Sequence, residues 1–131
     1  MPNLSVVLSA TVTVTDTTLS PSPTIISRSL NNPTLLPTAT FYDAFFQATV
    51  GGVAVSLPAA TSFFAYVKNL SAANNLTVAW TAVGAAGSST MLLLPGGVFI
   101  YALQAETGGG FTAMTLTGVG ATVPCDIVIA A

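Results

Sequence analysis

The chain has little charge and few of the side chains that perform chemistry. Its 131 residues include two basic residues, four acidic residues, one cysteine and no histidine. General acid–base catalysis is done most often by His, Asp, Glu or Lys. The acidic residues are isolated in sequence: they are Asp16, Asp43, Glu106 and Asp126. We therefore predict that the protein is not an enzyme and has no catalytic residue.

The same scarcity argues against most ligands. Arg28 and Lys68 alone cannot neutralise a phosphate backbone or a layer of anionic lipid, because both are bound through clusters of basic residues. Zinc sites need clustered Cys and His, and calcium loops need several converging oxygens. We expect no nucleic-acid partner, no membrane, no metal, no cofactor and no small-molecule substrate.

Long apolar runs and export signals are also missing. The uncharged stretch 44–67 has the length of a membrane span, but Gly51, Gly52 and Pro58 divide it into short pieces. The first residues lack the basic and then apolar pattern of a signal peptide, so we expect synthesis in the cytoplasm. Cys125 has no partner for an intrachain disulfide, and we expect it to be a small buried residue of a strand.

Hydrophobic residues are abundant instead. They make up 52% of the chain, the mean hydropathy is +0.79, and the formal net charge is −2. A typical soluble domain is about a quarter charged, and a net charge near zero favours association. We expect an oligomer or a component of a larger assembly.

Residues 1–38 form the first of two predicted regions. Between residues 4 and 18, apolar and hydroxyl side chains alternate, as they do in a half-buried strand. Four prolines then interrupt segment 19–38, which predicts an extended arm and not the interior of a sheet. This arm has apolar anchors that are candidates for partner contact: Ile25, Ile26, Leu35 and Leu36.

Residues 39–131 form the second predicted region, in which short apolar runs alternate with turn residues. Gly51-Gly52 predicts a hairpin between strands at 41–50 and 53–57. Further strands are expected at 62–68, 76–81, 91–94, 98–103, 111–117 and 124–130. The glycine clusters near 96 and 109 lack the lysine and helix of a phosphate loop and predict turns. The pattern indicates an all-β fold, a jelly-roll or immunoglobulin-like sandwich of two sheets and about eight strands.

Two of these strands are apolar on both faces. Only one face of each sheet in a sandwich reaches the core, so the other face must meet a partner. We assign four further candidate partner-binding residues: Phe64, Tyr66, Phe99 and Tyr101.

Trp80 has two possible roles. It shares its phase with Leu76 and Val78, which favours a place in the core. The alternative is a sugar-stacking platform with Tyr66 and Tyr101. Asn69 begins a glycosylation triplet, but we expect it to shape the turn that follows the strand at 62–68.

Four segments resemble small virion structural proteins of tailed bacteriophages, namely β-sandwich capsid decoration (cement) proteins and related modules. The segments are FAYVKNLS at 64–71, LTVAW at 76–80, LLPGGVFI at 93–100 and GGFTAMTL at 109–116. The resemblance covers about half of the chain and transfers no catalytic residue.

The resemblance implies a non-enzymatic protein that binds the outside of a phage capsid and reinforces the lattice. Its partners would be the major capsid protein and other copies of itself, as a homodimer or homotrimer on the exterior of the virion. The N-terminal arm would lie on a neighbouring subunit. Two alternatives are a head-fibre, tail or baseplate module and a carbohydrate-binding sandwich; another is a self-assembling shell protein that needs no capsid.

Overall fold

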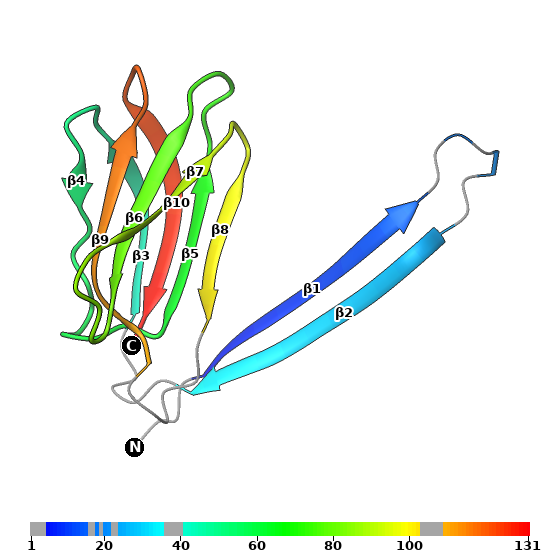
Figure 1. The fold of residues 1–131 in the computed structure, drawn as a ribbon, viewed down its shortest axis with the longest axis horizontal. Coiled ribbons are helices and arrows are strands. Elements are labelled where there is room, and N and C mark those ends of the chain that lie inside the picture. The colour runs from blue at the N-terminus through cyan, green and yellow to red at the C-terminus, as the bar shows by residue number, and fades with distance from the viewer. Residues whose placement is uncertain (1–4, 16–17, 19, 22–23, 36–40, 103–108) are drawn as a thin grey trace.

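A computed structural model describes residues 5–15, 18, 20–21, 24–35, 41–102 and 109–131 of the chain. For the first two strands, and for Phe41 and Ala102, it describes the backbone alone. The described residues form ten strands in three antiparallel sheets (Figure 1).

Eight of the strands form a sandwich of two four-stranded sheets, which confirms the predicted all-β fold. One sheet has the order β3-β10-β5-β8 and the other the order β4-β9-β6-β7. The bounds of the eight strands are β3 Phe41–Ala48, β4 Val53–Ala54, β5 Phe64–Asn69, β6 Leu76–Ala82, β7 Ser89–Leu93, β8 Val98–Ala102, β9 Phe111–Gly118 and β10 Val123–Ala130.

The strand pairing is nested, and it distinguishes between the two predicted kinds of sandwich. β6 pairs with β7, β5 with β8, β4 with β9 and β3 with β10. Residues 41–131 thus fold as one long hairpin that starts from the β6–β7 connection. From there outward, successive strand pairs lie alternately in the two sheets. This wrapped hairpin is the jelly roll, an eight-stranded arrangement of two Greek keys.

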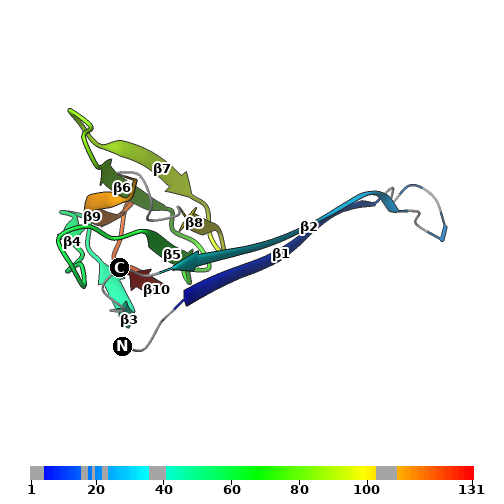
Figure 2. The same ribbon diagram turned by 90° about the horizontal axis from the view of Figure 1, so that it is seen from below.

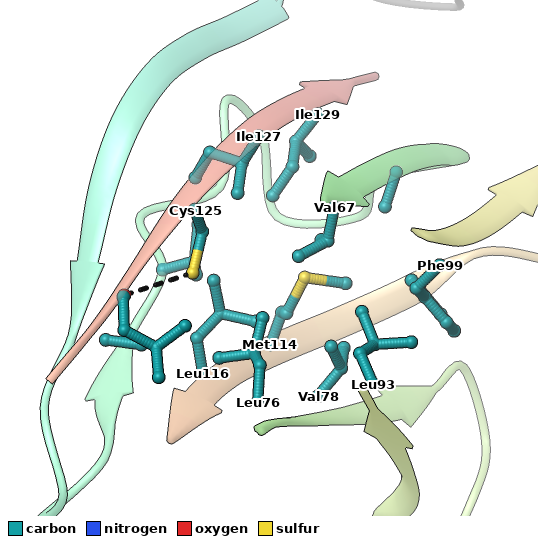
Figure 3. Packing of buried hydrophobic residues seen from close by; sticks show 14 of the residues in the cluster. Val67, Leu76, Val78, Leu93, Phe99, Met114, Leu116, Cys125, Ile127 and Ile129 are labelled. Carbon is teal, nitrogen blue, oxygen red and sulfur yellow. Dashed lines mark hydrogen bonds between the residues drawn. The ribbon is translucent and has the colours of Figure 1, made fainter. Parts of the chain in front are cut away.

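The core lies between the two sheets and follows the period-two alternation of the strands. β10 contributes Cys125, Ile127 and Ile129 from one sheet, and β9 contributes Met114 and Leu116 from the other; all five are buried (Figure 3). Side chains of successive strand residues point to opposite faces. Each sheet therefore also has an outer face, which the core does not use.

The first two strands form a separate two-stranded sheet. β1 (Ser5–Thr15) pairs with β2 (Thr24–Leu35) along their whole length. We call this pair the N-terminal hairpin. Figures 1 and 2 show it extending away from the sandwich, with only its base beside the end where β8 and β10 stop. The first strand thus pairs within its own subunit and not with the sandwich.

Two sequence-based expectations need correction here. Segment 19–38 was predicted to be irregular, yet β2 is a twelve-residue strand that contains Pro33. Both strands of a two-stranded ribbon are edge strands, and a sheet edge is where proline is tolerated.

The Gly51-Gly52 turn does not form a hairpin. β3 and β4, which flank it, belong to different sheets. The turn is closed by a hydrogen bond from Gly52 N to Thr49 O (3.1 Å), and Gly52 has a φ of 80°. A tight glycine turn bends the chain in either situation, so its sequence did not distinguish a hairpin from a crossing between sheets.

Candidate interaction surfaces

Four turns gather at one end of the sandwich, opposite the end at which the base of the N-terminal hairpin lies (Figure 1). They connect β3 to β4, β5 to β6, β7 to β8 and β9 to β10. Each turn exposes one aliphatic side chain by between 40% and 62%: Val50, Leu70, Leu94 and Val119. None of the four turns contains a charged residue. We call this surface the turn end.

Main-chain hydrogen bonds join the four turns to one another. Gly118 N donates to Thr49 O and Val119 N donates to Asn75 O, each at 2.9 Å. Gly96 N donates to Asn69 O at 3.1 Å, and Asn69 N donates to Gly97 O at 2.9 Å. A surface that is ordered before binding loses less conformational entropy when a partner docks.

Asn69 is the side chain that holds two of these turns together. It is fully buried, and its Nδ2 donates to the carbonyls of Asn74 (2.9 Å), Leu93 (3.2 Å) and Leu94 (3.1 Å). Its Oδ1 accepts a hydrogen bond from Ser71 N. The expectation that Asn69 shapes this turn is confirmed, and a side chain bonded in this way is not presented for glycosylation.

The outer face of the β3-β10-β5-β8 sheet is a second apolar surface. Phe45 is its most exposed large residue, at 66%, and Val98 and Ile100 are also exposed. Phe64 and Ala130 form a small buried cluster on this face, against which Tyr66 and Val128 pack. We call this surface the outer face.

Three charged residues lie among these apolar side chains. Asp126 stands between Phe45 and Lys68 in the register of the sheet, and Asp43 stands opposite Val128. Two acids and one base give the outer face a formal net charge of −1.

The structure distributes the predicted partner-binding residues between surface and core. Phe64 and Tyr66 lie on the outer face, where Phe64 is buried and Tyr66 packs against it. Phe99 and Tyr101 point the other way: Phe99 belongs to the core and Tyr101 packs against it. The outward residues of β8 are Val98 and Ile100.

The reason for this correction is the phase of β8. Every described residue of this strand is apolar or aromatic, so its composition gives no alternation from which the inward side can be read. The phase is set by the register with β5, where Phe99 pairs with the inward Val67.

Of the candidate arm residues, Ile25, Ile26 and Leu35 lie in β2. The positions of their side chains, and the whole of Leu36, lie outside the described part of the structure.

The aromatic residues do not form the platform that a sugar-binding role would use. Trp80 packs against the core, with its ring centroid 4.8 Å from that of Phe99. Tyr101 meets Phe111 edge to face at 5.2 Å, and its hydroxyl donates to Gly110 O at 3.1 Å. Tyr66 lies on the outer face instead. The core position favoured for Trp80 is confirmed.

Cys125 is buried in the core, as predicted, with Sγ 3.4 Å from the carbonyl oxygen of Val123. Desolvation by burial raises the pKa of its thiol from 9.0 to about 11. Desolvation likewise raises the pKa of Tyr101.

Within the described residues, no three His, Cys, Asp or Glu side chains group closely enough to hold a metal ion. The described part of the chain also contains no helix with the length and hydropathy to cross a membrane.

Comparison of the chain with profiles of known protein families, with curated proteins and with solved structures finds no match. The class that the fold itself defines is an eight-stranded jelly-roll sandwich with a projecting N-terminal hairpin.

Proposed function

We propose that the protein is a non-enzymatic structural component of a virion, which binds the outer surface of a phage capsid and reinforces its lattice. The observation that carries this proposal is the turn end: four turns, joined by hydrogen bonds, each with an exposed aliphatic residue and none with a charge. Turns at a protein surface are usually rich in polar residues. Exposed apolar surface of this kind marks a site of interaction.

The turn end suits a protein partner in particular. The cores of protein interfaces are depleted in charged residues and rich in apolar contacts. A lattice-reinforcing protein must also hold its contacts in a fixed geometry, and the hydrogen bonds between the turns provide this. In our proposal the turn end therefore faces the major capsid protein. The N-terminal hairpin leaves the opposite end of the sandwich and extends to its side.

The alternative of a fibre, tail or baseplate module uses the same sandwich and differs in its place on the particle. A sugar-binding role has less support, because Trp80 and Tyr101 pack inward while Tyr66 lies on the outer face.

The proposal is tested by co-sedimentation of the purified chain with empty capsids of tailed phages. Leu94→Asp and Val119→Asp each place a charge on an exposed position of the turn end. We expect each variant to lower capsid affinity at least about tenfold, because a charge must be desolvated in an apolar contact.

The matched control is Ala86→Asp, which adds the same charge to an exposed residue of the β6–β7 connection, at the other end of the sandwich. It should bind like the unmodified chain. Equal losses in all three variants, or no capsid binding by the unmodified chain, would refute the proposed contact.

A further inference from the structure

The N-terminal hairpin is incomplete as a structural unit. It is a two-stranded sheet, and an isolated two-stranded hairpin is marginally stable in water, because a sheet needs a third strand or a covering layer. Figures 1 and 2 show its length projecting away from its own sandwich. Some other surface must therefore cover it.

The register of the hairpin sorts its residues into two different faces. Residues directly opposite in an antiparallel pair belong to the same face, and the register pairs Ala10 with Leu30, Val12 with Arg28 and Val14 with Ile26. With the alternation of the first strand, one face is assigned two polar residues, Asn32 and Thr34, and seven apolar residues: Val6, Leu8, Ala10, Val12, Val14, Ile26 and Leu30. Arg28 is the one charged residue in the two strands, and it falls on this face.

The outer face of the sandwich has matching properties. It is apolar, with Phe45, Val98 and Ile100 exposed. Its formal net charge of −1, from Asp43, Asp126 and Lys68, is opposite in sign to Arg28, the one charged residue of the two hairpin strands; Asp16 lies in the connection between them. Complementary charge within an apolar contact favours one partner and one register over others.

The dimensions also agree. A strand rises about 3.3 Å per residue, so the eleven residues of β1 extend about 36 Å. The eight residues of β10, in the interior of the sheet, extend about 26 Å by the same rule. The hairpin is thus long enough to cover the whole length of the outer face.

We propose that the N-terminal hairpin of one copy of this chain docks, by its apolar face, onto the outer face of the β3-β10-β5-β8 sheet of a second copy, with Arg28 toward Asp43 and Asp126. The inference rests on the assembly role proposed above but does not depend on capsid binding. Hairpin on sheet is a heterologous contact, so it closes into a ring, such as a trimer, where the rotation between copies allows it.

The test is a charge exchange, followed by sedimentation velocity without capsids. Arg28→Glu makes the hairpin acidic, and the double variant Asp43→Lys/Asp126→Lys makes the outer face basic. Each variant alone then places like charges at the contact, and we expect its self-association to weaken at least tenfold. In an equimolar mixture, every contact between the two different variants joins opposite charges, and self-association should recover well above that of either variant alone.

Two further variants keep the test independent of folding. Asp43→Lys changes an exposed residue only, and Phe45→Ser removes the most exposed apolar side chain of the face. Both should leave the thermal midpoint nearly unchanged and weaken self-association several-fold.

An unmodified chain that stays monomeric at about 100 μM would overturn the inference, because the contact would then be too weak to hold copies of the chain together. Single-charge variants that assemble normally would overturn it as well. If the unmodified chain self-associates but does not bind capsids, the result argues against the proposed function and not against this inference.

Discussion

Asn69 has a structural role that its place in a glycosylation triplet does not suggest. Its amide group donates to three main-chain carbonyls from two turns and accepts from the amide of Ser71, all beneath the surface of the turn end. An asparagine suits this position because its side chain carries both donors and acceptor in one plane.

Asn69→Ala should lower the free energy of unfolding by about 2–3 kcal/mol, because it leaves buried carbonyls without a donor. Asn74→Ala is the control: the structure uses the main-chain oxygen of Asn74, which the substitution keeps, and its effect should stay within about 0.5 kcal/mol. Urea denaturation of both variants measures the difference. If the two variants were equally stable, water would have taken the place of the Asn69 side-chain amide.

Cys125 makes stability depend on pH in the alkaline range. The pKa of its thiol is raised from 9.0 to about 11 in the folded protein, so the unfolded chain loses the proton first as the pH rises. The thiol's contribution to stability is therefore fully present below pH 9 and is lost between pH 9 and 11. Two pKa units correspond to about 2–3 kcal/mol.

The contribution is isolated by measuring the free energy of unfolding at pH 8 and pH 11 for the unmodified chain and for Cys125→Ala. Titration of Tyr101 affects both chains equally and cancels in the comparison. The unmodified chain should lose more stability than the variant over this interval. Parallel losses would show that the thiol does not contribute.

At the scale of elements, the end of β9 passes closely beneath the β3–β4 crossing. A Cβ on Gly118 would lie 2.6 Å from Ala48 O and closer still to Ala121 O, both of them main-chain atoms that cannot rotate away. This glycine is required for close approach of the backbone.

Gly118→Ala should destabilise the sandwich by about 2–4 kcal/mol, because the main chain around it must shift. Gly87→Ala provides the comparison, since nothing lies within 4 Å of a Cβ there, and we expect a change of less than about 1 kcal/mol. Thermal melts followed by circular dichroism are sufficient. A tolerated Gly118→Ala would indicate that the β9–β10 turn is softer than its hydrogen bonds suggest.

Residue patterns predicted most strands but not their partners. The predicted strand at 76–81 corresponds to β6 (Leu76–Ala82), and the one at 98–103 to β8 (Val98–Ala102). Alternation identifies a strand and its two faces, whereas pairing depends on contacts between distant segments. The hairpin predicted at Gly51-Gly52 was wrong for this reason. β2 was missed because it contains Pro33 and because further prolines flank it in the sequence.

The candidate surfaces were predicted in part. Apolar residues on both sides of a strand did indicate an outer face, and Phe64 and Tyr66 lie there. The turn end was missed, because Val50, Leu70, Leu94 and Val119 are single residues in separate turns. Their proximity exists only once the jelly roll brings the four turns together.

At the scale of the whole molecule, the sandwich and the N-terminal hairpin are separate sheets with separate pairing. The core between the two sheets of the sandwich is formed by residues from Ala48 to Ile129. The two regions should therefore respond differently to truncation.

Deletion of residues 1–38 should leave a cooperatively folded sandwich that self-associates more weakly. Circular dichroism, thermal melts and sedimentation velocity measure these properties. An unfolded 39–131 fragment would show that the first strands complete the core. A folded fragment with undiminished association would assign assembly to the sandwich alone.

The nested pairing also determines when the sandwich can close during synthesis on a ribosome. β3 is the first of its eight strands to emerge, and its neighbour β10 is the last. β10 also separates β3 from β5, so their sheet has a gap at its centre until translation has passed Ala130. Until then, the unpaired edges of β3 and β5 are open to pairing with nascent chains on neighbouring ribosomes. A premature stop codon that removes only β10 would leave the gap permanently.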